Sequence, residues 1–229
     1  MRTILVGLAL VASVTMARAN PVLRPAFDLS SENVTITVSR SESRITGDYT
    51  FRSRGPNPRR FTDEIWLDLP VSMPTNGMMT AAEQRDAPPE QVNKLIDKWL
   101  DLVKPNGTLD KKDFSLDTMP SANYLTRQVE SQLPPGWGIL SFWTRLYADA
   151  CRPEVKLYLT YIQPHLPGNI SAYLPILWGA DKSGCLITFK VEDGGYLTRL
   201  GNYEVVGNPT DTSISVRPAH LQLLQVQVK

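Results

Sequence analysis

The sequence is short of the residues that hydrolases and metal sites use most often. It contains only two histidines, His165 and His220, and only two cysteines, Cys151 and Cys185. The histidines stand in no H-E-x-x-H, H-x-H or similar zinc-binding arrangement, and the chain has neither a G-x-S-x-G nucleophile elbow nor a glycine-rich phosphate loop. Local motifs therefore predict no metal, no cofactor and no catalytic residue.

An excess of charge of either sign is also absent. The 229 residues include 24 lysines and arginines and 23 aspartates and glutamates. A protein that binds nucleic acid needs surplus cations to neutralise phosphates, so this balance argues against nucleic acid as a partner. The densest basic group flanks a turn at residues 55–58 and consists of Arg52, Arg54, Arg59 and Arg60. We interpret it as a solvated hairpin end, with an anion contact as the alternative.

Long apolar runs are missing beyond the N-terminus. The run Ile4–Met16 would form a helix of roughly 20 Å, which is shorter than the roughly 30 Å hydrocarbon core of a bilayer. Small residues at 17–19 follow it, as at a signal-peptidase site. We expect residues 1–19 to be a secretory signal peptide cleaved before Asn20, with an uncleaved anchor as the alternative. The mature chain is then secreted or periplasmic and has no stable membrane span.

This expected compartment determines how the cysteines are interpreted. In an exported protein an isolated pair most simply forms one disulfide, here Cys151–Cys185. Closing a loop of about 35 residues would stabilise the fold by roughly 3–4 kcal/mol in the chain-entropy treatment. The alternative is a catalytic thiol with the other cysteine as a bystander.

Alternating apolar and polar residues predict β-strands over most of the chain. The first three strands, at residues 34–39, 43–54 and 61–71, are expected to form an antiparallel meander, with Gly47 marking a β-bulge. Further strands are predicted at 139–148, 155–162, 172–178, 185–191, 204–206, 213–216 and 221–228. Residues 20–229 should thus form a single, mainly β domain, an antiparallel β-sandwich of immunoglobulin-like or jelly-roll-like type.

A helical insertion of about 50 residues, at about 81–133, is expected to interrupt these strands. Residues 90–103 carry apolar side chains at spacings of three and four, and the prolines before them suit the first turn of a helix. A weaker second helix is predicted at 121–133.

Exposed aromatic residues are the candidate binding residues. Trp66 projects from the strand face opposite Ile65 and Leu67, and Trp137 lies in a loop rich in proline and glycine. A sugar ring could stack on either indole, although the alternative role is an aromatic anchor in the core or a loop.

These features give two hypotheses of different classes. The first is an exported, non-catalytic β-sandwich protein that binds a protein or a glycan at the envelope or outside the cell. The second is a secreted hydrolase that uses carboxylates, His165 or His220 in a site between the helical insertion and the sheet. A scaffold without a ligand is a third possibility.

Intact-mass spectrometry checks the leader and the disulfide together. The protein recovered from an exporting host should begin at Asn20 and should gain two hydrogen atoms on reduction. A chain that keeps residues 1–19 in the cytosol, or an exported chain whose mass does not change on reduction, would contradict these expectations.

Overall fold

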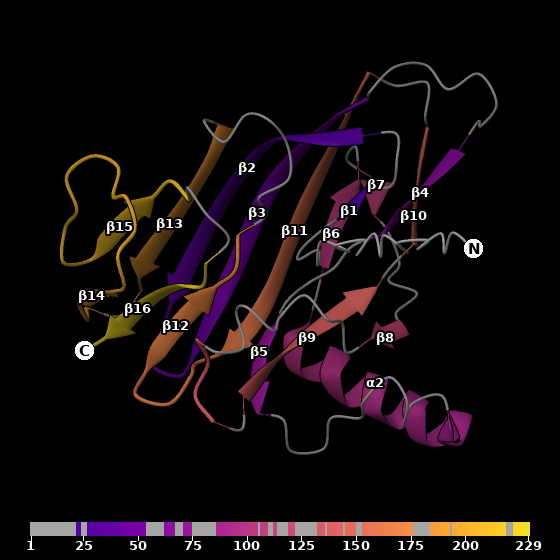
Figure 1. The fold of residues 1–229 in the computed structure, drawn as a ribbon, viewed down its shortest axis with the longest axis horizontal. Helices are drawn as coiled ribbons and strands as arrows, with labels where there is room; N and C mark the ends of the chain where they lie inside the picture. Colours follow the sequence, from indigo (N-terminus) through magenta and orange to yellow (C-terminus); the bar gives the residue numbers. More distant parts are fainter. Residues whose placement is uncertain are drawn as a thin grey trace, which may run out of the picture.

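The computed structural model of the chain is mainly β-structure, with few helical residues among those it describes (Figure 1). It describes residues 22–23, 27–53, 62–66, 71–74, 86–104, 106–109, 112–113, 119–121, 132–135, 137–143, 145–149, 153–175, 184–192, 194–218 and 222–229. Within these segments, no helix is both long enough and apolar enough to cross a membrane.

The largest element is a seven-stranded sheet with the strand order β15-β13-β2-β3-β11-β6-β7. Its strands are β2 (Phe27–Val38), β3 (Glu42–Ser53), β6 (Asn106–Leu109), β7 (Lys112–Asp113), β11 (Glu154–Pro164), β13 (Cys185–Val191) and β15 (Ser213–Val216). Successive side chains of a strand point to opposite faces. Buried and more exposed residues alternate along the central strands, so this sheet has an inner and an outer face.

Three smaller sheets have three strands each. The sheet β12-β16-β14, here called the small sheet, consists of β12 (Ile170–Tyr173), β16 (Leu224–Val228) and β14 (Leu197–Leu200). The others are β1-β4-β10, from β1 (Val22–Leu23), β4 (Thr62–Trp66) and β10 (Arg145–Asp149), and β5-β9-β8, from β5 (Val71–Pro74), β9 (Trp137–Trp143) and β8 (Met119–Ser121).

The main core lies between the inner face of the seven-stranded sheet and the small sheet. It joins residues such as Val34, Ile45 and Leu159 of the large sheet to Tyr173 and Val226 of the small sheet in one buried cluster. Figure 1 shows β12 and β16 lying across the large sheet at this place. A second cluster forms on the other side of β12 and consists of Leu133, Leu166, Ala172, Leu174 and Leu223.

The prediction of a mainly β fold is confirmed, and two sheets pack face to face as in a sandwich. The prediction of a wholly antiparallel arrangement is wrong at one pair, because β13 runs parallel to β2, with Cys185 opposite Glu32 and Val191 opposite Val38. The alternation of residues along a strand predicts its two faces but not the direction of its neighbour. The immunoglobulin-like or jelly-roll-like topology is not confirmed by this strand order.

The predicted three-strand meander holds only for its first two strands. β2 and β3 pair antiparallel along nearly their whole length. The third strand, β4, instead pairs with β1 and β10 in a separate sheet, and the other neighbour of β3 is β11. Sequence proximity favours pairing between consecutive strands. Here, however, β11 pairs with β3 over eleven residue pairs and occupies the edge of β3 that β4 was expected to pair with.

The helical insertion of about 50 residues is not confirmed as a whole, although the helix predicted at its residues 90–103 is present. Helix α2 (Pro89–Val103) forms where residues 90–103 predict it, and Lys104 ends it with a positive φ of 44°. The rest of the 81–133 segment includes β6, β7 and β8, and β6 joins the large sheet beside β11. Of the second predicted helix, residue 121 belongs to β8 and residues 132–133 lie in a turn, whereas 122–131 lie outside the described residues.

The predicted β-bulge at Gly47 is wrong. The register shift between β2 and β3 falls between Leu29 and Ser31, and Gly47 pairs regularly with Val34. A Cβ atom at Gly47 would lie 2.5 Å from the ring of Tyr49, which is on the same face of β3 two residues later. The missing side chain therefore makes room for the tyrosine ring in the core.

A double-mutant cycle tests this role of Gly47. Gly47→Ala should lower the free energy of unfolding by about 1–3 kcal/mol, because the new methyl group must displace the Tyr49 ring. In a Tyr49→Val background, the same substitution should cost much less. Urea unfolding of the four proteins measures both values. An equal loss in the two backgrounds would show that the ring is not the reason for the glycine.

Candidate functional site

Four polar side chains are almost completely buried where the large sheet meets β12: Glu32, Ser43, Gln163 and Ser171. Three of the contacts here join the two layers directly. Ser43 Oγ lies 2.7 Å from Ser171 Oγ, and Gln163 donates from Nε2 to the carbonyl oxygen of Ala172 at 2.7 Å. The hydroxyl group of Tyr173 donates to Glu32 Oε1 at 2.7 Å. Every one of these contacts has one partner on β12.

Glu32 sits among three buried tyrosines. Tyr49 Oη lies 3.3 Å from Tyr173 Oη, which in turn bonds to the glutamate. Burial raises the pKa of Tyr49, Tyr161 and Tyr173 well above the ordinary tyrosine value, and the charge of Glu32 raises it further. The phenols therefore stay protonated and can act as hydrogen-bond donors to the carboxylate.

Ser43 and His165 form the described pair that comes nearest to a catalytic arrangement. His165 Nε2 lies 3.1 Å from Ser43 Oγ, a distance suited to a serine nucleophile and its base. Burial lowers the pKa of His165, although the backbone and the carboxylate of Glu42 oppose the shift. Ser43 is, however, only 1% exposed and also contacts Ser171, so a substrate cannot reach its hydroxyl group without local opening. In this geometry His165 holds the turn after β11 against β3.

The structure does not bring the two candidate tryptophans together. Trp137 opens β9, is partly buried and packs against the second core cluster, which fits the anchor role. Trp66 ends β4 opposite Val22 and Arg145, in a different sheet, and its side chain lies outside the described residues. Sugar stacking on either indole stays a prediction.

The predicted disulfide also stays a prediction. Cys185 is buried at the start of β13, whereas Cys151 lies outside the described residues, among which no disulfide occurs. Cross-strand pairing puts Cys185 in one row with Glu32, Tyr49 and Leu157. Leu157, six residues after Cys151, is thus three strand spacings or about 14 Å from Cys185. His220, the other candidate base, is likewise outside the described residues.

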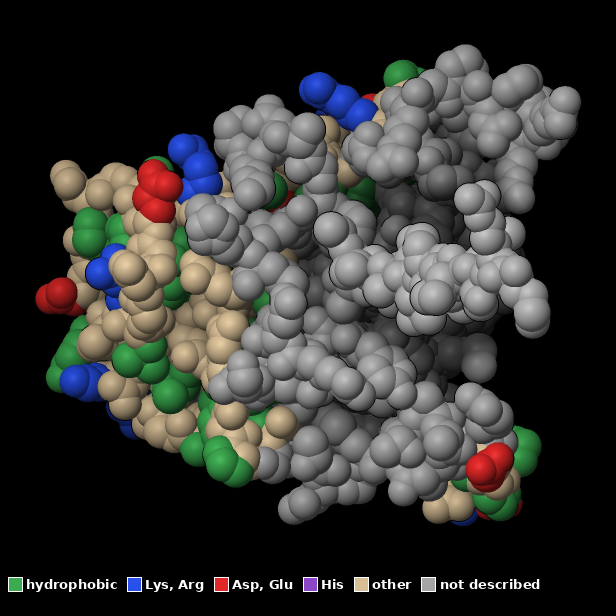
Figure 2. Space-filling view, in the orientation of Figure 1, with side chains coloured by type: hydrophobic (Ala, Val, Ile, Leu, Met, Phe, Trp, Pro, Cys, Tyr) green, Lys and Arg blue, Asp and Glu red, His purple; other side chains and the backbone are tan. Residues whose placement is uncertain are grey.

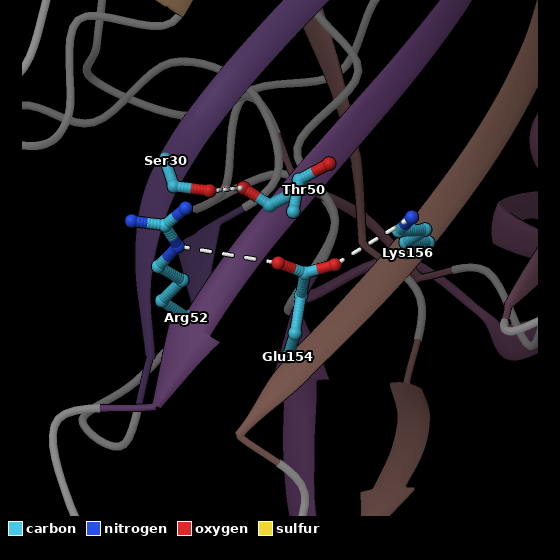
Figure 3. Close-up of polar contacts among 5 residues, drawn as sticks. All are labelled: Ser30, Thr50, Arg52, Glu154 and Lys156. Atoms are coloured by element: carbon cyan, nitrogen blue, oxygen red, sulfur yellow. Dashed lines mark hydrogen bonds and ion pairs between the residues drawn. The ribbon is translucent and has the colours of Figure 1, made fainter.

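The outer face of the large sheet is open to solvent and polar. Tyr158 of β11 is 41% exposed there, and Arg52, Glu154 and Lys156 project from β3 and β11 nearby (Figure 3). Glu154 lies 4.0 Å from the Arg52 guanidinium and 3.6 Å from the Lys156 ammonium. Such exposed pairs contribute little to stability. Arg52, one member of the predicted basic group, is thus a solvated residue with a carboxylate neighbour.

One hollow of about 390 Å³ lies at the end of the two packed sheets. Its lining consists of Val38, Ser39, Arg40, Asn169, Val191, Gly194, Gly195, Val228 and Lys229. Arg40 and Lys229 are the charged residues of this lining. Among the described residues, no group of three histidine, cysteine or acidic side chains is placed to bind a metal ion.

The face seen in Figure 2 carries the small sheet. Its described surface is largely uncharged, with cationic and anionic side chains scattered near the margin and no patch of one sign. The candidate binding residues predicted from the sequence were single aromatic residues and did not include the outer face of the large sheet. The available signal was the threonines at alternate positions of the predicted strands, such as Thr35, Thr46 and Thr188, but only the register shows that they lie side by side.

Comparison with known proteins gives a likeness in fold. No family model and no curated protein matches the chain. A crystal structure of a "putative nutrient binding protein" from Legionella pneumophila is similar over 91% of this chain and 69% of its own length, with a TM-score of 0.50 and 14% identity. An M1 zinc metallopeptidase from Deinococcus radiodurans aligns with 90% of this chain and 43% of its own, with a TM-score of 0.39 and 11% identity. The first likeness shows a shared fold.

Proposed function

We propose that the protein is an exported, non-catalytic binding protein whose partner is a protein or a glycan, in the periplasm or outside the cell. The observation that carries this proposal is the open outer face of the large sheet. The inner face is filled by the small sheet, whereas Asn33, Asp48 and Tyr158 remain exposed on the outer face. A flat sheet face presents its side chains at regular spacings, as a partner of extended shape requires.

Two further observations support a binding role. The similar structure from Legionella pneumophila bears a name that describes nutrient binding, and the likeness in fold makes a binding role reasonable for this chain. The basic start and short apolar run at the N-terminus are typical of an exported chain. Export would put the outer face in contact with envelope polymers and secreted proteins.

A hydrolase is the alternative, and the Ser43–His165 contact of 3.1 Å is the observation in its favour. Against it stands the burial of the serine, which leaves no room for a substrate carbonyl group beside the nucleophile. The buried contact with Ser171 also occupies the serine hydroxyl. The pair therefore serves the packing of β12 better than it serves catalysis.

Binding and hydrolysis can be measured on the same exported protein. We expect saturable binding to a polysaccharide in affinity electrophoresis or to a purified envelope protein in a direct titration. We expect no turnover of ester, peptide or glycosidic substrates above a blank. Ser43→Ala should leave binding unchanged. Turnover that Ser43→Ala and His165→Gln both abolish would replace the proposal with the hydrolase, and absence of any partner would remove it.

The pH dependence of stability tests whether His165 is buried in its neutral form. Because burial places its folded-state pKa below the ordinary value, the unfolded chain takes up the proton first as pH falls. His165 thus contributes stability at pH 7 that is lost progressively below about pH 6.5. Urea unfolding at pH 7 and pH 5 should show a smaller pH-dependent loss for His165→Gln than for the wild type. Equal losses in both proteins would contradict this assignment.

A further inference from the structure

We propose that an uncharged, linear glycan binds along one row of side chains that crosses the outer face of the large sheet. This inference rests on the proposed function and names its ligand class and its surface. The row, here called the hydroxyl row, takes one residue from each of six neighbouring strands. Its members are Ser215, Thr188, Thr35, Thr46, Thr160 and, at the end, Asn106.

The strand register makes this row continuous. Each member is the direct cross-strand partner of the next, in both the parallel pair β13–β2 and the antiparallel pairs. All members point outward, because the residues before and after them on β2, β3 and β11 are buried. Neighbouring strands are about 4.8 Å apart, so the row is about 24 Å long. This length suits several sugar units of an extended chain.

Four of the five hydroxyl groups in the row contact one another in pairs. Thr46 Oγ1 lies 3.4 Å from Thr160 Oγ1, and Thr188 Oγ1 lies 3.0 Å from Ser215 Oγ. Each hydroxyl can donate one hydrogen bond and accept two, so capacity remains in both directions after these contacts form. A polyhydroxyl ligand, which also offers donors and acceptors at short intervals, matches such a surface.

Longer side chains border the hydroxyl row on both sides. Lys190 and Arg44 lie in the adjoining row on one side, with Thr37 between them. Asp48 and Tyr158 lie in the adjoining row on the other side, beside Asn33. The borders thus carry both signs of charge, while the hydroxyl row carries none. A polyanion would be repelled by Asp48 and would find no uniformly positive surface. An uncharged chain meets no such repulsion. Tyr158, 41% exposed, supplies an aromatic ring on which a sugar can stack.

The strand preference of threonine does not by itself explain the row. Threonine suits a half-exposed strand position anywhere, but arginine, lysine, aspartate and glutamate all occur on the same face. Lys190, Arg44 and Asp48 occupy the adjoining rows and the glutamates lie farther away on this face, whereas the six described positions of the hydroxyl row carry no charge. A chain of short, neutral, hydrogen-bonding side chains across six strands is the arrangement that needs a reason.

Affinity electrophoresis of the exported protein tests the inference with defined probes. The gels contain hydroxyethyl cellulose, glucomannan or pullulan as uncharged chains, and alginate as an anionic control. We expect retardation by at least one uncharged chain and none by alginate. Thr46→Val with Thr160→Val removes two hydroxyl groups at nearly constant shape and should weaken binding about tenfold or more. Tyr158→Ala should weaken it by about tenfold.

Matched variants keep the result interpretable. Thr50→Val changes a threonine on the same face of β3 but outside the hydroxyl row. Tyr196→Ala removes a tyrosine that is 51% exposed and lies outside the strands. Both should bind as the wild type does, and thermal unfolding of every variant shows whether it is folded.

The outcomes distinguish this inference from the proposed function. Glycan binding that survives Thr46→Val with Thr160→Val and Tyr158→Ala would overturn the hydroxyl row and leave a glycan-binding protein whose site lies elsewhere. Saturable binding to a purified protein without any uncharged chain would overturn the glycan and keep the binding role. Self-association that the row variants abolish would make the face an interface between copies instead. Failure to bind any partner would remove both proposals.

Discussion

The buried contacts between β12 and the inner face of the large sheet are the constraint on which the rest of the structure depends. Glu32 and Ser43 are buried polar residues where the two sheets meet, and a buried polar group without a partner is costly. Each is paired with a residue of β12, Glu32 with Tyr173 and Ser43 with Ser171. Apolar contacts alone tolerate a shift of one sheet over the other, whereas these pairs are satisfied in one relative position. They therefore fix where the small sheet sits.

The same constraint decides which face of the large sheet remains open. Once β12, β16 and β14 cover the inner face, the alternate residues of β2, β3 and β11 point to the outer face, where they are half-exposed or exposed. Those positions carry threonine, aspartate, arginine and tyrosine, which tolerate water. Surface for a partner thus arises on the outer face as a consequence of how the inner face is packed, and His165 contributes to that packing through its contact with Ser43.

Sequence alone predicted the elements better than their arrangement. The alternation in β13 and β15 and the apolar stripe of α2 gave nearly the observed bounds, because each of these patterns is local. The parallel partner of β13, the transfer of β4 to another sheet and the entry of β6 beside β11 depend on contacts between distant segments, which no local pattern encodes. The candidate surface was missed for the same reason, since Thr46 and Thr160 are 114 residues apart in the chain.

The hydroxyl row and the core are two results of one register. A slip of a single residue between β2 and β3 would turn the valines and isoleucines outward and the threonines inward, since alternate side chains change face together. Glu32 would then lose its hydrogen bond from Tyr173. The slip that would break the hydroxyl row would therefore also cost the free energy of this buried contact. The glycine opposite Val34 adds a further penalty, because the ring of Tyr49 fits only where Gly47 leaves room for it. Thr35 and Thr46 are held side by side by the residues behind them, which bury a carboxylate and three phenols. A surface built in this way is preorganised, so a ligand that binds there spends little free energy on ordering the strands.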